Sequence, residues 1–438
     1  MRLVVNRIAP TARRMGRHEF RENLRDRRRV GVRLDFRIAS DGRFLQGSVG
    51  GIVYDSLVMM PSFRLPSLLF ASFSLIAMTA AADGLRDRFT DPKDGEFDAS
   101  DYLLDHRGVL PVPIIITEPA IGYGGGFAAM WFSESIRDAA SHAQQGGRLT
   151  PPNILALAAF GTENGTRGAA AGGRLSFDQD RWRYRGGIGV PKINLDFFGV
   201  GGEGRAIAYT LKGFGTQNDL TRRIGDSDHF LGMRFLYLDL KSTLNADVAG
   251  TGLTPRDFAR RSSELGLLWQ YDSRDNIFTT THGVDGALEM MFASPSLGSD
   301  TSFQTYRARV FTYIPVTETF VGALRIDGRT ARGDVPFYQL PFVEMRGVPA
   351  ARYQDESAGV LEAEGRYYVT PRWIAVAFAG VGRVWGRNSG FNDVNNVVSK
   401  GLGFRYLIAR RLGLSGGLDV AWGPEKTAYY ISLGNAWK

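Results

Sequence analysis

Histidine close to serine or aspartate could hydrolyse an ester or a peptide bond, and histidine grouped with carboxylates could hold a metal ion. Four of the five histidines follow residue 83, namely His106, His142, His229 and His282. They stand in separate segments, without the spacing of a catalytic triad or of a metal site. The sequence therefore predicts no catalytic residues, no metal and no cofactor, and it indicates that the protein is not an enzyme.

Two glycine-rich stretches have the composition of a phosphate-binding loop. They are YGGGFAAM at Tyr123–Met130 and GVGGEG at Gly199–Gly204. Both lack the lysine and the strand-to-helix context that such a loop requires. Closely packed strands or tight loops are the better interpretation, because glycine lets neighbouring backbones approach each other.

Arg346 and Gly347 lie in FVEMRGVPAARY, a connection between two segments that alternate apolar and polar residues. The simplest interpretation is that an arginine in such a loop is exposed to solvent. The alternative is a loop that folds back into the protein and needs the charge there. A buried guanidinium would then require a carboxylate partner, because an unpaired buried charge is strongly destabilising.

The composition indicates an ordered chain of 438 residues without cysteine, which excludes disulfide bonds and thiolate chemistry. Hydrophobic and aromatic contents of 44% and 12% exclude a disordered chain. The net charge of +8 is concentrated in residues 1–58, which hold thirteen arginines and six acidic residues. This basic head could be an RNA-binding tail, but the balanced remainder predicts no nucleic-acid partner. The alternative is that the head is not part of the mature protein.

A secretory signal peptide is predicted at residues 59–82. The stretch MMPSFRLPSLLFASFSLIAMTAAADG has one basic residue, an apolar run, and three alanines before Asp83. The run is too short and too rich in serine for a transmembrane helix. A signal peptide belongs at an N-terminus, so translation is expected to begin at Met59 or Met60. Residues 1–58 would then be a disordered, non-native upstream extension.

Two regions are expected in the exported chain. Residues 83–109 are polar and lack a clear period, which predicts a periplasmic arm or plug. Residues 110–438 consist of segments of about ten residues that alternate apolar and polar side chains between turn residues, without sustained helical spacing. The expected strands are 112–119, 121–134, 152–162, 165–178, 181–190, 205–219, 229–241, 261–272, 282–293, 303–315, 318–331, 356–369, 373–386, 398–410, 411–423 and 427–437.

The parity of these segments discriminates between two folds, because successive strand side chains point to opposite faces. In RLGLSGGLDVAWG, Leu412, Leu414 and Leu418 share one face and Asp419 lies on the other. A soluble β-sandwich would turn the leucines inward, whereas a membrane barrel would turn them to lipid and the charges to the lumen. Export without a helical anchor favours a transmembrane antiparallel β-barrel of about sixteen strands. So do aromatic residues at segment ends, namely Trp269, Tyr271, Trp385, Trp422 and Trp437.

Charged residues predicted to face the lumen have balanced signs. This balance favours a self-paired interior over a pore lining that sets ion selectivity. The residues are Arg307, Arg309, Arg325, Arg329, Arg366, Arg405, Asp285, Glu289, Asp327, Glu362, Glu364 and Asp419.

Several motifs resemble the bacterial surface antigen superfamily, the outer-membrane barrels of the BamA/TamA type and their two-partner secretion relatives. YDSRDNIFTTTHG, from Tyr271, resembles that family's Tyr-Asp-x-Arg-Asp-Asn…Gly turn. MRGV, from Met345, resembles the Val-Arg-Gly-Phe/Tyr motif of its sixth extracellular loop, and it falls between the eleventh and twelfth expected strands. NLDFFGVGG, from Asn194, resembles a loop of the TamA-like branch. The resemblance covers about residues 110–438.

Two features depart from the family pattern. The strand after the loop motif usually reads Phe-x-Asp-x-Gly, but Phe378, Gly380 and Gly382 stand there, so the aspartate that helps to hold the loop arginine is missing. Family members that insert proteins carry periplasmic POTRA domains before the barrel. Residues 83–109 are too few for one such domain, so the chain resembles a POTRA-less member.

The resemblance implies roles for three groups of residues. The loop would fold into the lumen, where Arg346 would be pinned by Glu362 and Glu364, with Gly347 at a positive φ. The periplasmic turn motif would consist of Asp272, Arg274, Asp275, Asn276 and Gly283. A network that holds the turn is a simpler interpretation of these residues than a binding site. The last strand would form one side of an imperfectly closed seam between the first and last strands. On one face of this strand stand Tyr429, Ile431, Leu433 and Trp437.

The function that the resemblance implies is insertion of outer-membrane proteins or translocation of a substrate, at the bacterial outer membrane. Expected partners are outer-membrane lipid and lipopolysaccharide, with unfolded outer-membrane protein clients or an unknown periplasmic partner. The alternatives are a passive channel or a purely structural barrel, and a soluble periplasmic binding module.

Overall fold

The structure is a computed structural model that describes residues 89–144, 152–198, 206–244, 258–386, 390–435 and 437. The predicted upstream extension, the signal peptide and the stretch Gly199–Gly204 lie outside these residues. Two short helices, α3 (Ser100–Asp105) and α4 (Ile136–Gln144), were not expected from the sequence pattern. No helix among the described residues is long and apolar enough to cross a membrane.

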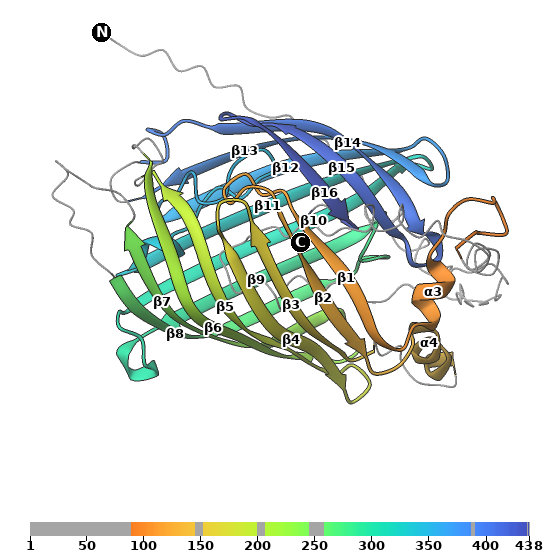
Figure 1. Ribbon diagram of the computed structural model, residues 1–438, viewed down its shortest axis with the longest axis horizontal. Coiled ribbons are helices and arrows are strands. Elements are labelled where there is room, and N and C mark those ends of the chain that lie inside the picture. Colours follow the sequence, from red (N-terminus) through yellow and green to blue (C-terminus); the bar gives the residue numbers. More distant parts are fainter. Residues whose placement is uncertain are drawn as a thin grey trace, which may run out of the picture. The chain divides into compact units, whose positions relative to one another are not determined.

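In the described part of the chain, sixteen strands form one antiparallel sheet, in which each strand is hydrogen-bonded to its neighbours in sequence (Figure 1). This confirms the predicted fold class, an antiparallel β-barrel of sixteen strands. The strands are β1 (Gly108–Ile116), β2 (Gly124–Phe132), β3 (Ile154–Thr162), β4 (Arg167–Phe177), β5 (Trp182–Phe197), β6 (Ile207–Arg223), β7 (His229–Leu244), β8 (Phe258–Asp272), β9 (Gly283–Ala293), β10 (Phe303–Thr317), β11 (Phe320–Gly333), β12 (Ser357–Tyr368), β13 (Trp373–Trp385), β14 (Val397–Ala409), β15 (Leu414–Trp422) and β16 (Thr427–Leu433).

Burial along the strands is inverted relative to a soluble protein. On β12 the side chain of Leu361 is 46% exposed, whereas Glu362 and Glu364 are buried. On β11 Ile326 is exposed between the buried Arg325 and Asp327. Apolar side chains therefore face outward, where lipid would cover them, and ionised side chains face the lumen.

Strand β5 is longer than predicted, because it continues through Pro191 to Phe197. Proline lacks a backbone N–H and is tolerated in a sheet only where none is needed. The pairing of β5 with β6 skips Val190 and Pro191, between the pairs Gly189↔Gly215 and Lys192↔Lys212. The proline therefore lies at a break in one ladder, and it does not end the strand.

The prediction that Leu412 and Leu414 face lipid is wrong. Leu412 lies in a 3-10 helix, Arg410–Leu412, and both leucines are buried in a cluster with Leu104 of α3. Leu418 is partly exposed and Asp419 is buried, so parity holds further along the strand. The leucines nearest the turn are covered by the segment that precedes β1.

The two ends of the barrel differ in the length of their connections. At the end where β1 begins, turns such as 318–319 and 369–372 are short, whereas the connection 334–356 lies at the opposite end. In outer-membrane barrels the short turns are periplasmic and the long loops extracellular, and we name the two ends accordingly.

The sheet has two edges that face each other, β1 and β16. Fifteen ladders join consecutive strands, but among the described residues no ladder joins β1 to β16. In Figure 1 they are the first and the last strand of the sheet, at its two free edges. We call this unpaired boundary the seam.

Candidate functional site

The extracellular connection 334–356 folds into the barrel. Its residues Val343, Met345 and Val348 are buried against Val360 and Val384, which belong to β12 and β13. Burying these side chains removes apolar surface from water and holds the loop inside. The loop therefore brings Arg346 into the lumen.

Arg346 is 2% exposed and is surrounded by carboxylates. Its Nε donates to Glu362 Oε1 at 2.9 Å, and its Nη1 donates to Asp419 Oδ2 at 3.1 Å. Its Nη2 lies 2.7 Å from Glu364 Oε2, an ion pair without the alignment of a hydrogen bond. The guanidinium also stacks on Phe378, 3.5 Å from the ring centre. The structure thus brings Arg346 together with both of its predicted partners.

Asp419 is a partner of Arg346 that sequence reasoning missed. Parity places Asp419 in the lumen, but nothing in the sequence indicates which arginine it faces. The family's usual aspartate is replaced by Gly380, where an added Cβ would lie 2.5 Å from the sulfur of Met345. Met345 occupies that space, and Asp419 supplies the third carboxylate from β15.

Gly347 has a φ of +84°, a conformation that is unfavourable for residues with a side chain. A Cβ at this position would lie 2.5 Å from Ser399 Oγ and 3.2 Å from the backbone nitrogen of Gly423. Ser399 Oγ also donates a hydrogen bond to the carbonyl oxygen of Arg346. The turn therefore requires glycine both for its backbone angle and for its close packing.

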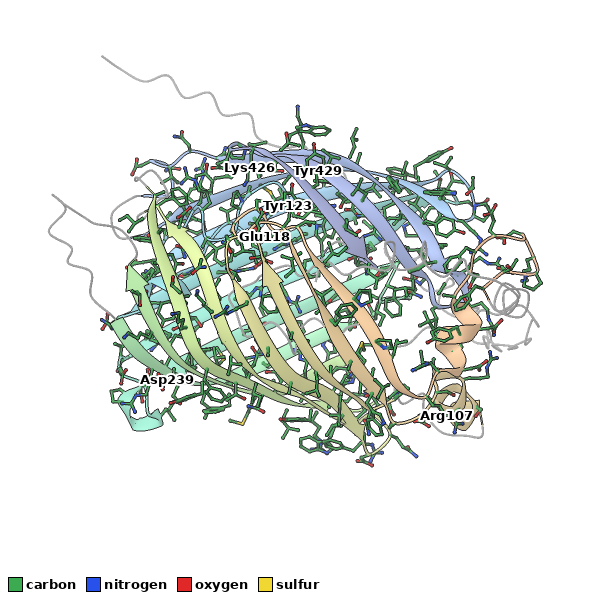
Figure 2. The ribbon with its side chains drawn as sticks, viewed as in Figure 1. Arg107, Glu118, Tyr123, Asp239, Lys426 and Tyr429 are labelled. Carbon is green, nitrogen blue, oxygen red and sulfur yellow. The ribbon has the colours of Figure 1, made fainter. Side chains whose placement is uncertain are left out.

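The same loop contacts both sides of the seam. Gly347 N donates to Tyr430 Oη at 2.8 Å, on β16, and Ala350 N donates to Glu118 Oε1 at 3.1 Å, beyond the end of β1. Lys426 Nζ also reaches the carbonyl oxygen of Pro119, at 3.3 Å. Figure 2 shows Glu118 and Lys426 near this extracellular part of the seam.

Tyr353 ties the loop to the β15–β16 turn through a hydrogen bond from its hydroxyl to Glu425. Burial and this hydrogen bond raise the pKa of Tyr353 to about 12, so the hydroxyl stays protonated and can donate near neutral pH.

Most lumen-facing charges are paired with each other. Asp327 accepts hydrogen bonds from Arg307, Arg325 and Arg329, each with a distance of 2.9 Å to Oδ2. Arg405 donates to both oxygens of Asp419, at 2.6 and 2.8 Å. The lumen is therefore crossed by ion pairs rather than lined by charges of one sign.

The predicted turn motif between β8 and β9 is a hydrogen-bonded network. Arg274 donates two hydrogen bonds of 2.8 Å to Asp272 and lies 3.2 Å from Asp285. Asn276 Nδ2 donates to the carbonyl oxygen of Leu412 at 2.9 Å, which connects this turn to the β14–β15 turn. Asp275 and Gly283, two further members of the motif, hold the backbone of the turn in its conformation.

Asp275 accepts hydrogen bonds from the backbone nitrogens of Thr281 and His282, at 2.9 and 3.1 Å. Gly283 has a φ of +110°, and a Cβ there would lie 2.4 Å from the carbonyl oxygen of Ser273. All five predicted residues therefore lie in one turn, which supports a structural role.

The last strand is shorter than predicted, and Trp437 does not share its outer face. Tyr429 is 47% exposed, but β16 ends at Leu433, and Gly434 with a φ of +75° turns the chain. Trp437 is buried, with its ring stacked on Phe311 at a centroid distance of 6.1 Å. The prediction of an aromatic girdle residue at Trp437 is wrong, because the glycine redirects the tail into the lumen.

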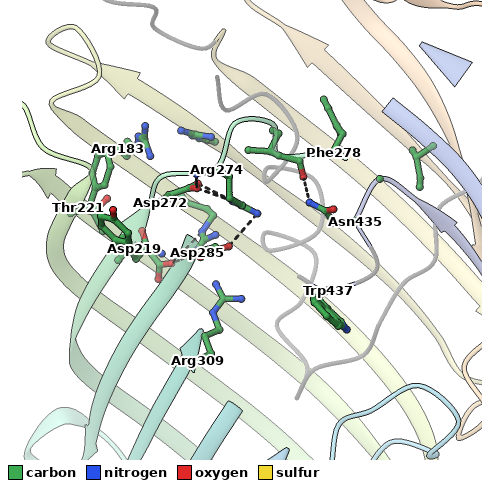
Figure 3. A pocket seen from close by; sticks show the side chains of 18 of the residues that line it. Arg183, Asp219, Thr221, Asp272, Arg274, Phe278, Asp285, Arg309, Asn435 and Trp437 are labelled. Atoms are coloured by element: carbon green, nitrogen blue, oxygen red, sulfur yellow. Dashed lines mark hydrogen bonds and ion pairs between the residues drawn. The ribbon is translucent and has the colours of Figure 1, made fainter. Parts of the chain in front are cut away.

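A cavity of about 180 Å³ lies beside this tail (Figure 3). Arg183, Asp219 and Arg274 line one side, and Phe278 and Trp437 line another. The space is large enough for several water molecules, which could hydrate the ion pairs. No local pattern in the sequence predicts this cavity, because its walls come from segments that are far apart in the chain.

The histidines His106, His229 and His282 contact different residues in the described part of the chain. No group of three metal-ligating side chains is found there. His106 packs against Phe132, and His229 packs against Trp269. His282 lies 3.4 Å from Asp275 in the turn motif.

The family model of the Omp85 superfamily domain matches residues 167–344. The match runs from β4 to the loop and stops two residues before Arg346. No curated protein matches the chain by sequence.

The solved structures that are similar to this chain include the following three. BamA from Haemophilus ducreyi lacking POTRA domains 1–3 has a TM-score of 0.53 and 11% identity, over 75% of this chain and 70% of that chain. CdiB from Acinetobacter baumannii has a TM-score of 0.50 and 14% identity, over 74% and 59%. CdiB from Escherichia coli has a TM-score of 0.50 and 12% identity, over 73% and 61%. The chain spans less than two thirds of either CdiB chain.

Proposed function

From the premise that this chain is a bacterial outer-membrane β-barrel with an Omp85 superfamily domain, we propose that it passes protein chains into or across the outer membrane. The reactive element would be the seam. Its clients would be unfolded outer-membrane proteins or a secreted protein chain.

The observation that carries this proposal is the unpaired boundary between β1 and β16 in a sheet whose other neighbours are all paired. An edge strand presents free backbone N–H and C=O groups, and an extended segment of another chain can add to it by hydrogen bonding. In lipid such an edge is especially unfavourable, because no water satisfies it. A client strand that pairs with the edge would remove that penalty.

The strands beside the seam are also short. β1, β15 and β16 have nine, nine and seven residues, whereas β5 and β6 have sixteen and seventeen. A shorter strand makes fewer ladder hydrogen bonds, so this part of the wall is the easiest to separate.

The loop 334–356 would support this role by keeping β1 and β16 aligned while no client strand is bound between them. It contacts Tyr430 on one side and Glu118 on the other, and Arg346 anchors it to the wall. We propose this as the purpose of the pinned loop.

The test is to lock the seam. The chain has no cysteine, so Pro119→Cys and Lys426→Cys can be joined by a short bismaleimide. The matched control joins Val420→Cys to Tyr429→Cys, which are opposite each other on the paired strands β15 and β16. Insertion of an unfolded barrel protein into liposomes should be lost when the seam is locked and kept in the control. Equal insertion by both would contradict the proposal.

A passive channel is the competing function. The ion pairs that cross the lumen, and the loop folded into it, are unfavourable for a wide aqueous pore. In planar bilayers we expect small, irregular openings from the purified protein. Large and steady conductance would favour the channel instead.

A further inference from the structure

The segment before β1 is attached to the barrel by an arginine that three aspartates surround. Arg372, in the β12–β13 turn, has a side chain that is only 4% exposed. Its Nη2 donates to Asp91 at 2.8 Å, its Nε to Asp94 at 2.5 Å and its Nη1 to Asp98 at 3.1 Å. We call residues 90–105 the arm.

Main-chain hydrogen bonds add to this attachment. Ala99 N donates to the carbonyl oxygen of Ile408 at 2.7 Å, and Tyr406 Oη donates to that of Phe97 at 2.9 Å. Arg410 N donates to Asp98 Oδ2 at 3.1 Å. The arm is therefore specifically docked on the periplasmic ends of β14 and β15.

An apolar cluster extends this contact across the end of the seam. Leu104 of α3 is fully buried together with Ile136 of α4, which follows β2, and with Leu412 and Leu414 beside β15. Leu433, the last residue of β16, packs against the same cluster. Burial of these side chains removes apolar surface from water on both sides of the seam.

Ion pairs fix α3 to the β1 side as well. Arg137 of α4 donates to Asp101 at 3.0 Å and also to Asp105. Figure 1 shows α3 and α4 together at this end of the barrel, beside the ends of β1 and β15. The arm then continues directly into β1 at Gly108.

We propose that the arm is a clasp that closes the periplasmic end of the seam, and that its release allows β1 and β16 to separate. The arm is covalently continuous with one edge and is bound non-covalently to the strands next to the other edge. Separating the edges requires that one of these attachments be lost. The clasp regulates the site of the proposed function, but its own test involves no client.

The chemistry of the clasp makes it releasable. When the arm leaves, its aspartates and Arg372 both become accessible to water, so no charge is left buried without a partner. A second acidic segment with similar spacing could therefore replace the arm on Arg372 and Arg410. The barrel wall itself does not have to unfold.

The experiment measures the distance between the edges. Spin labels are placed at Val109→Cys on β1 and Ile431→Cys on β16, in protein reconstituted into nanodiscs. The test variant combines Asp91→Asn, Asp94→Asn and Asp98→Asn, which changes only the arm. The control, Arg107→Ala, removes the exposed ion pair with Asp138 of α4, which lies on the same rim but on the β1 side alone. Heat-modifiable migration verifies that every variant is folded.

We expect a longer distance component in the triple variant that is absent from the unmodified chain and from the control. Limited proteolysis of the same samples should cleave the arm of the triple variant faster. A cleaved arm with an unchanged distance would show that the arm does not hold the seam. An arm that stays protected would show that the aspartates do not dock it. Either result would overturn the clasp, whether or not the protein inserts clients.

Discussion

Two arginines of this barrel, Arg346 and Arg372, are each held by three carboxylates, and they differ in which part of the molecule supplies the cation. Each is buried and lies within 3.1 Å of three carboxylates. At Arg346 the loop supplies the cation, and the wall supplies the carboxylates. At Arg372 the wall supplies the cation, and the arm supplies the carboxylates.

This difference determines what remains when the contact is broken. Loss of Arg346 would leave Glu362, Glu364 and Asp419 buried in the lumen. Loss of the contact at Arg372 would free carboxylates on an arm that can move into water. Glu362, Glu364 and Asp419 would each keep one other arginine, but a buried charge that loses a partner is more unfavourable than a solvated one. The first site is therefore suited to permanent fixation, and the second to reversible docking.

The largest effect is expected for Arg346→Ala. The substitution should lower the free energy of unfolding by about 3–5 kcal/mol, because three buried carboxylates lose a shared partner. Urea-dependent loss of heat-modifiable migration measures this change. Arg332→Ala is the control, because Arg332 is exposed and lies 3.9 Å from Glu356 near the same loop. Equal stability of the two variants would mean that Arg346 does not pin the loop.

A smaller loss is expected for Gly347→Ala, because the positive φ alone costs about 1–3 kcal/mol. Contact with Ser399 and Gly423 adds to this strain. Gly298→Ala separates the two causes, since Gly298 has a φ of +92° but no atom within 4 Å of an added Cβ. The same urea titration should show a larger loss for Gly347→Ala. Identical losses would leave backbone strain as the sole cause.

Arg372→Ala should destabilise the barrel less than Arg346→Ala does, by about 1.5–3 kcal/mol, the range for a lost hydrogen bond to a charged group. Its main effect should be on the arm, which proteases would reach more quickly while the wall stays folded. A loss of stability as large as that of Arg346→Ala would contradict the distinction between the two arginines.

Mild acid should have the smallest effect, and it should act on the arm. The hydrogen bond from Arg372 lowers the pKa of Asp94 below its ordinary value of 3.8, and burial opposes this only in part. The contact with Arg372 therefore stabilises docking above pH 3.8, and its contribution is lost as the pH falls below that value. Other charged groups face the same contact, because Asp98 also pairs with Arg372 and Asp91 also pairs with Arg410. Protease sensitivity of the arm should stay constant from pH 7 to 5 and rise only below about pH 4.

Sequence parity predicted the strands well because it is a local property. Alternation along LEAEGRYYV is enough to place Glu362 and Glu364 in the lumen, whichever strand lies across from them. The same rule failed at Leu412 and Leu414, because a 3-10 helix interrupts the period and the arm covers them.

Long-range partners could not be predicted in the same way. The third partner of Arg346, Asp419, depends on how the barrel closes and on how far the loop enters it. The position of Trp437 depends on one backbone angle, at Gly434. The aspartates of the arm looked like an unstructured polar stretch, because their partner Arg372 lies 281 positions beyond Asp91.

The strict neighbour-to-neighbour order of the sheet has a consequence for how the barrel forms. Each ladder joins strands that are adjacent in sequence, so the wall can grow hairpin by hairpin with small losses of chain entropy. Contacts across the seam join residues that are far apart in the sequence, and Pro119 and Lys426, for example, are separated by 307 positions. Closing such long loops is entropically unfavourable, so these contacts should form last and open first.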